Sequence, residues 1–116
     1  MTEIQFWELI RLSKKESEGD DQKQLEALKI RLGELPNEEI YAFDNLLQKY
    51  YKASYTSHLW CVAYIVLGGC SDAGFDHFRG WLIAQGQEVY ENALESPDSL
   101  LPVFDKLRRG NRVYSK

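Results

Sequence analysis

The spacing of the apolar residues constrains the fold of this chain more than any other feature. One stripe recurs at intervals of three and four residues, at Leu25, Leu28, Leu32 and Leu35. The same intervals return after Pro36, at Ile40, Phe43, Leu47 and Tyr50. Residues with this spacing share one side of an α-helix, whereas a half-buried strand alternates at every second residue between turn signals. Because no segment of the sequence shows that alternation, we predict an all-α fold.

Residues that start and stop helices divide the chain into six or seven short helices. Thr2 and Gln5 have the spacing of a capping box, so the first helix is expected to begin there and to end within the polar stretch 13–21. After the two striped helices, further helices are expected over residues 57–67, 72–85, 87–95 and 99–109. Their apolar faces require one shared core, so we predict a single domain, 1–116, with a short basic tail from about residue 105.

Residues 57–67 are apolar nearly all round, which predicts a central helix buried by its neighbours. The uninterrupted apolar run within them, 59–67, is about half the length of a membrane span. Polar residues interrupt the first twelve positions, so we expect no signal peptide. Two cysteines do not make a secreted disulfide framework. Together these features predict a cytoplasmic protein without membrane contact.

The charge is distributed unevenly along the chain. The whole sequence has a net charge of −4, but residues 105–116 carry five basic side chains and one acidic side chain. The first 104 residues therefore hold nine basic and seventeen acidic side chains. Because an acidic body repels a phosphate backbone, nucleic acid is disfavoured as a partner.

One segment, 68–83, carries most of the residues with chemical potential. On a helix, Asp72, Asp76 and Arg79 lie within about 60° of one another, beside the apolar face. In a structural interpretation, which we favour, Asp76 and Arg79 pair at i, i+3 and hold neighbouring helices together. In a functional interpretation the trio faces a cleft, where Ser71 and His77 complete an enzyme or small-ligand site.

Metal and cofactor sites are not indicated. The cysteines and histidines are Cys61, Cys70, His58 and His77, and they form neither a C-x-x-C pair nor an H-x-x-x-H pair. The glycine pair before Ser71 lacks the Lys-Ser/Thr ending of a phosphate loop. We therefore predict no metal and no cofactor, and we name no catalytic residue.

Two surface features indicate a partner. Acidic residues at i, i+3 and i+7 of the helix over 87–95 form a stripe of Glu88, Glu91 and Glu95. Tyrosines gather at the end of the third helix, at Tyr50, Tyr51 and Tyr55. Tyrosine is enriched at interaction hot spots, and acidic surfaces speed association with basic partners. The tyrosines would also suit a homodimer interface.

The sequence resembles the bacterial domain-of-unknown-function family 4240. The resemblance is carried by Trp7, Gly86 and residues 40–43, 59–64, 68–72, 75–83, 89–90 and 96–100. One departure is visible, because the family pattern Ser-Asp-Asp-Gly-Phe reads Ser-Asp-Ala-Gly-Phe here, with Ala73 at its centre. The resemblance implies a small, helical, bacterial cytoplasmic domain, and it supplies no activity or catalytic residue.

Two hypotheses about function follow from the sequence. The first is a protein-binding module, in its most concrete form an immunity protein that neutralises a toxin through an acidic, tyrosine-rich surface. The second is an enzyme or small-ligand domain built on the segment that contains Asp72 and Arg79. We prefer binding, because the residues do not form a complete catalytic set.

Overall fold

The helix boundaries follow the capping residues of the sequence. The structure, a computed structural model, describes residues 1–103, and these form an all-α fold without strands, as predicted. The elements are α1 (Glu3–Ser17), α2 (Asp21–Gly33), α3 (Asn37–Ala53), α4 (Ser57–Leu67), α5 (Asp72–Ala84), α6 (Gln87–Glu95) and the 3₁₀ helix η1 (Pro97–Ser99). The helix predicted over 99–109 is observed only for residues 100–103, and its remainder and the basic tail lie outside the described residues.

Side chains near the ends of α1 explain its limits. The Thr2 hydroxyl accepts a hydrogen bond from the Gln5 amide (3.1 Å), and the Gln5 side chain accepts one from the Thr2 amide (2.9 Å), which completes the predicted capping box. The polar residues Ser13 and Ser17 stay helical and buried, because each hydroxyl donates to a backbone carbonyl three residues earlier (2.8 Å). The helix ends at Ser17, and the following C-cap residue, Glu18, has a left-handed φ of 52°.

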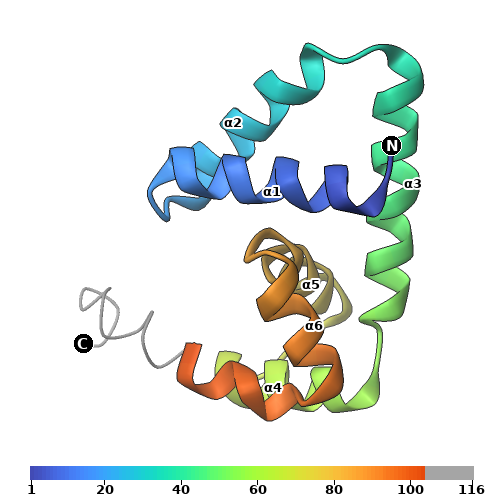
Figure 1. Ribbon diagram of the computed structural model, residues 1–116. Helices are drawn as coiled ribbons and strands as arrows, with labels where there is room; N and C mark the ends of the chain where they lie inside the picture. Colours follow the sequence, from blue (N-terminus) through green and yellow to red (C-terminus); the bar gives the residue numbers. More distant parts are fainter. Residues whose placement is uncertain (104–116) are drawn as a thin grey trace.

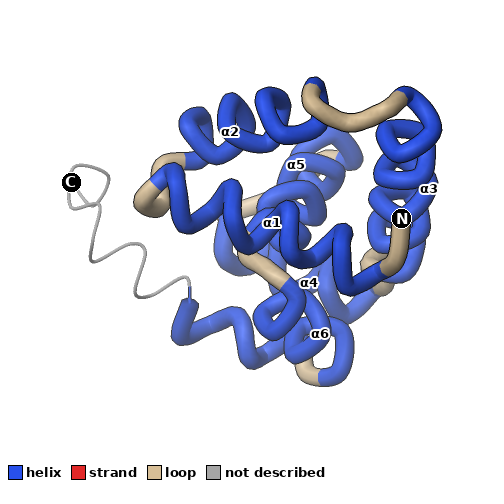
Figure 2. The backbone as a smooth tube through the Cα atoms, turned by 45° about the horizontal axis from the view of Figure 1, so that its top comes forward, coloured by secondary structure: helices blue, strands red, loops and turns tan. Residues whose placement is uncertain are grey.

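The central helix is α1. It crosses the middle of the molecule in Figure 1, with α2 above it and α5 below it, and packs against α2, α3 and α5; Figure 2 shows α3 at its N-terminal end. The sequence placed 57–67 at the centre, and this prediction was wrong. In α4 one face, containing Leu59, Val62 and Ala63, is buried, but Tyr64 and Ile65 are 56% and 74% exposed. An apolar helix is buried only as far as neighbours cover it, and α4 packs mainly against α5 and η1.

An aromatic cluster joins α1, α3 and α6 in the core. The rings of Phe6 and Trp7 lie 5.1 Å and 4.8 Å from the ring of Tyr50, and Trp7 lies 5.4 Å from Tyr90. The Tyr50 hydroxyl accepts a hydrogen bond from Trp7 Nε1 (3.2 Å) and donates one to the Glu3 carboxylate. The Tyr90 hydroxyl donates to the Tyr50 carbonyl (2.6 Å). Polar atoms of the cluster are therefore paired as its rings are buried.

Removal of the Tyr50 hydroxyl should destabilise the fold. Tyr50→Phe leaves the buried Trp7 Nε1 without its acceptor, and we expect a loss of about 1–3 kcal/mol in the free energy of unfolding. Tyr41→Phe is the matched control on the same helix, because Tyr41 is 70% exposed, and it should change stability by less than about 0.5 kcal/mol. Urea denaturation measures both variants, and equal losses would contradict this role for Tyr50.

The same tyrosines should make the protein sensitive to alkali. Burial, with the hydrogen bond to Glu3, raises the pKa of Tyr50 from 10.0 to about 12, and burial raises the pKa of Tyr90 to about 12. The unfolded chain therefore loses these protons at a lower pH than the folded chain. The contribution to stability is complete below pH 10 and disappears as the pH rises to about 12. Urea midpoints measured across this range should fall, and they should fall less steeply in Tyr90→Phe.

Candidate functional site

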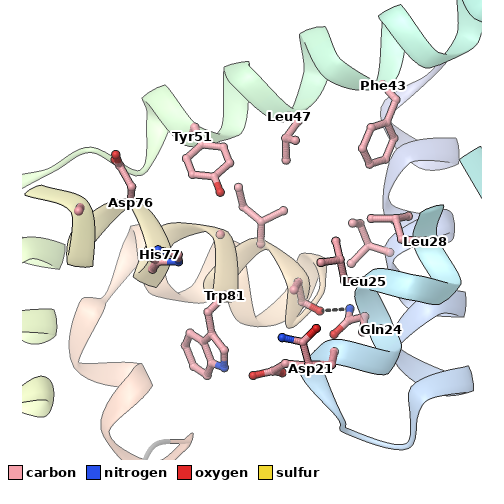
Figure 3. Close-up of a pocket in the computed structure, with 16 residues that line it drawn as sticks. Asp21, Gln24, Leu25, Leu28, Phe43, Leu47, Tyr51, Asp76, His77 and Trp81 are labelled. Atoms are coloured by element: carbon pink, nitrogen blue, oxygen red, sulfur yellow. Dashed lines mark hydrogen bonds between the residues drawn. The ribbon is translucent and has the colours of Figure 1, made fainter.

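An open groove lies between α2, α3 and α5 (Figure 3). Its volume is about 710 Å³, which is within the range of protein ligand pockets, roughly 300–1,000 Å³. Apolar side chains dominate the three sides: Leu25 and Leu28 from α2, Phe43, Leu47 and Tyr51 from α3, and Trp81 and Ile83 from α5. We call this feature the α2/α3/α5 groove.

The groove exists because the leucine stripe of α2 is only partly covered. Gln24 is the one buried residue of α2, and its side-chain amide donates to the Ala84 carbonyl at the end of α5 (2.8 Å). Leu25 is 48% exposed, and Leu28 is half-buried. Since α2 packs mainly on α1, the first half of its stripe faces α3 and α5 across open space. The stripe therefore lines a surface that a further apolar group could cover.

A close approach between α3 and α5 forms the opposite side of the groove. The Tyr51 hydroxyl lies so near the backbone of Gly80 that a Cβ atom there would collide with it. Burial raises the pKa of Tyr51 above its ordinary value, although the nearby Arg79 cation acts in the opposite direction. Gly80 therefore allows the Tyr51 ring to lie directly against α5 beside the groove.

Carboxylates are the charged groups of the groove. Asp21 begins α2 and Asp76 lies on α5, so the two acidic groups reach the groove from different helices (Figure 3). His77 also lines it, whereas no lysine or arginine stands among the described residues that do. We call Asp21 and Asp76 the acidic pair of the groove. The site thus combines an apolar interior with acidic edges.

Arg79 lies outside the groove and holds α5 against the end of α3. The residue is 6% exposed, and its guanidinium carbon lies 5.4, 4.8 and 4.9 Å from the rings of Tyr51, Tyr55 and Phe75. Nη1 donates to the Tyr51 carbonyl (2.7 Å), and Nη2 donates to the Asp76 carboxylate. This geometry matches the structural interpretation of the Asp76–Arg79 pair.

The five residues of the small-ligand hypothesis do not gather in one place. Asp76 and His77 line the groove, but Ser71, Asp72 and Arg79 do not. The Ser71 hydroxyl accepts from the Gly74 amide (3.1 Å) and caps α5, and Asp72 is exposed in the first turn of that helix. Two of the five therefore face the groove, and Ser71 and Arg79 have structural contacts instead.

The residues predicted to bind a partner also separate into different environments. Glu88, Glu91 and Glu95 are exposed along α6, and within residues 1–103 no cation pairs with them. The tyrosines do not form one surface patch, because Tyr50 is a core residue at 7% exposure and Tyr51 lines the groove. Of the three, only Tyr55 is largely exposed, at 59%. The tyrosine-rich surface predicted from sequence is corrected accordingly.

Metal-binding clusters and membrane-spanning helices are both absent from the described residues. Nowhere in 1–103 do three histidine, cysteine or acidic side chains approach one another as a metal site requires. None of the helices described has the length and apolar character needed to cross a membrane.

Comparison with known proteins gives a single finding. The family model described as "Protein of unknown function (DUF4240)" matches residues 1–114 of this chain. No curated protein and no solved structure matches it.

Arg79 and Asp76 should differ in their contribution to stability, although they form one ion pair. Arg79→Met removes the donor to the Tyr51 carbonyl and the cation among three rings, and we expect a loss of about 1–3 kcal/mol. Asp76→Asn should cost less than about 1 kcal/mol, because the Asp76 side chain is 65% exposed. Urea denaturation at pH 7 measures both, and a larger loss in Asp76→Asn would contradict the structural role of Arg79.

Proposed function

The chain belongs to the DUF4240 family of proteins of unknown function, and we propose that it is a protein-binding module that recognises a basic partner. The observation that carries this proposal is the exposed row of carboxylates on α6. Glu88, Glu91 and Glu95 follow one side of the helix, and no cation within residues 1–103 neutralises them. We call these three residues the α6 glutamate stripe.

The charge of the surrounding chain strengthens the field of the α6 glutamate stripe. Residues 1–104 contain seventeen acidic and nine basic side chains. A field of one sign extends about a Debye length, roughly 8 Å, into solution and raises the rate at which oppositely charged proteins meet. Such a body selects basic partners and repels acidic ones.

Binding fits the local chemistry better than catalysis does. Ser71 is engaged as a helix cap, and Arg79 is enclosed by aromatic rings. A catalytic nucleophile or anion-binding group needs access to a substrate, and these contacts engage the Ser71 hydroxyl and enclose the Arg79 guanidinium. Asp76 and His77 remain accessible at the groove, where they can contact a partner.

The narrower form of the proposal is an immunity protein of a bacterial cytoplasm that neutralises a toxin. A toxin whose active site is basic would be attracted by the same carboxylates and blocked when they cover it. Fast association favours an inhibitor that must act before its target does. The acidic surface supports this form, and identification of the partner decides it.

Reversal of the α6 glutamate stripe should slow complex formation. In Glu88→Lys/Glu91→Lys/Glu95→Lys, the association rate constant with the partner should fall by about tenfold or more at low salt. The partner is first captured from the native organism with the tagged full chain and identified by mass spectrometry. Surface plasmon resonance then measures its association with both proteins.

A second triple variant separates local charge from net charge. Glu26→Lys, Asp44→Lys and Glu34→Lys change the net charge equally at exposed positions away from α6, so this control should bind faster than the stripe variant. Equal rates in the two triple variants would contradict the assignment to α6. A captured partner that is acidic would contradict the proposed function itself.

A further inference from the structure

The α2/α3/α5 groove exposes apolar surface that the charge argument does not use. Leu25 is 48% exposed, and Leu28, Leu47 and Trp81 are half-buried along the same groove. Burial of apolar surface contributes about 25 cal/mol for each Å² removed from water, so an occupant of this groove would gain affinity that the α6 glutamate stripe cannot supply. We propose that the groove binds one amphipathic helix of a partner, apolar on the bound face and basic beside it.

The arrangement of the groove fits the side chains of a helix. Leu25 and Leu28 of α2 face Leu47 and Tyr51 of α3 across the α5 surface (Figure 3). A helix that lies in such a groove inserts residues at i, i+3 or i+4, and i+7, and the groove receives these side chains while the helix backbone stays outside. A volume of about 710 Å³ suits a row of several apolar side chains.

The acidic pair of the groove specifies the charge of this occupant. Asp21 is exposed on one side, and Asp76, on another side, is 65% exposed even though it accepts from Arg79. Asp76 is already paired with Arg79, which lies outside the groove, whereas no ion pair among the described residues involves Asp21. Lysine or arginine next to the apolar face of a bound helix would therefore find an unpaired carboxylate at Asp21 and an exposed, already paired one at Asp76.

The same charges disfavour a second copy of this chain as the occupant. Residues 1–104 of each copy are strongly acidic, with seventeen acidic and nine basic side chains. Two such bodies repel one another at the distance of an interface. The groove itself adds a carboxylate from α2 and another from α5 to that repulsion. A basic segment of a different protein relieves it. The basic residues 105–116 of a second copy would relieve it too, and a mass of the full chain that rises with concentration in analytical ultracentrifugation would overturn the choice of a different protein.

This inference rests on the proposed function only in that the occupant is part of a protein, and its test uses other residues than the α6 glutamate stripe. A display library of randomised peptides, about four helical turns long, is selected against the full chain. Enriched peptides are synthesised, and fluorescence polarisation measures their affinity. We expect apolar residues at helical spacing, flanked by lysine or arginine, and a change in tryptophan emission on binding that Trp81→Phe abolishes.

Two variants of α2 locate the binding site. Leu25→Gln removes an apolar contact from the groove and should weaken binding by about tenfold or more, whereas Ile30→Gln should stay within about twofold. Ile30 is a matched control, because it is 65% exposed on the same helix and does not line the groove. Ala73→Arg, at an exposed groove position on α5, supplies a second variant that introduces a cation and should also weaken the binding of basic peptides.

Each outcome decides a defined part of the inference. Peptides that lose affinity in Leu25→Gln but carry no basic residues would overturn the charge requirement. Peptides unaffected by Leu25→Gln and Ala73→Arg, or the absence of any enriched peptide, would overturn the groove as a docking site. Binding of a neutral apolar dye at the groove without peptide binding would replace the helix by a small ligand. In these cases the rate measurements on the α6 glutamate stripe still test the proposed function separately.

Discussion

The contact between α1 and the paired tyrosines Tyr50 and Tyr90 is the interaction on which the rest of the structure depends. Through it α1 joins α3 and α6, which are far apart in sequence, at a single cluster of rings. The hydrogen bonds from Trp7 to Tyr50 and from Tyr90 to the Tyr50 carbonyl make the packing directional as well as apolar. Of the helices beyond this cluster, α2 packs on α1, α5 packs on α1, α3 and α6, and α4 packs on α5 and η1.

The groove follows from how α2 and α5 attach to this centre. Arg79 fastens α5 to the end of α3, and its neighbour Gly80 allows Tyr51 to lie directly on the helix. By contrast, α2 packs mainly on α1 and reaches α5 through the Gln24 hydrogen bond to Ala84. The junction between α3 and α5 is therefore tight, the junction between α2 and α5 is looser, and the open space lies between them. A polar residue at the α2 contact leaves the leucines free to line that space.

The sequence predicted helices well because their signals are local, and it predicted burial less well because burial depends on neighbours. Capping by Thr2 and Ser71 involves residues three positions apart, so both helix starts could be recognised. The apolar run in α4 and the position of Tyr50 in the sequence did not show which of these side chains neighbouring helices would bury. Tyr50 has the periodicity of a core residue and the composition of an interface residue, and only its contact with Trp7 decides between them.

The candidate site illustrates the same limit. The spacing of Leu25 and Leu28 showed that they share a helix face, but it could not show that this face remains half open. Asp76 and His77 belonged to the predicted ligand set and Tyr51 to the predicted partner surface, but their spacing could not show that they line one groove with Leu47. Long-range charge and short-range apolar contact also act at different stages of an encounter: carboxylates raise the rate of meeting and are screened by salt, whereas apolar burial lengthens the life of the complex. An acidic chain with an uncovered leucine groove combines the two effects. Its carboxylates favour fast association with a basic partner, and its groove favours slow dissociation, whereas neither feature alone would give both.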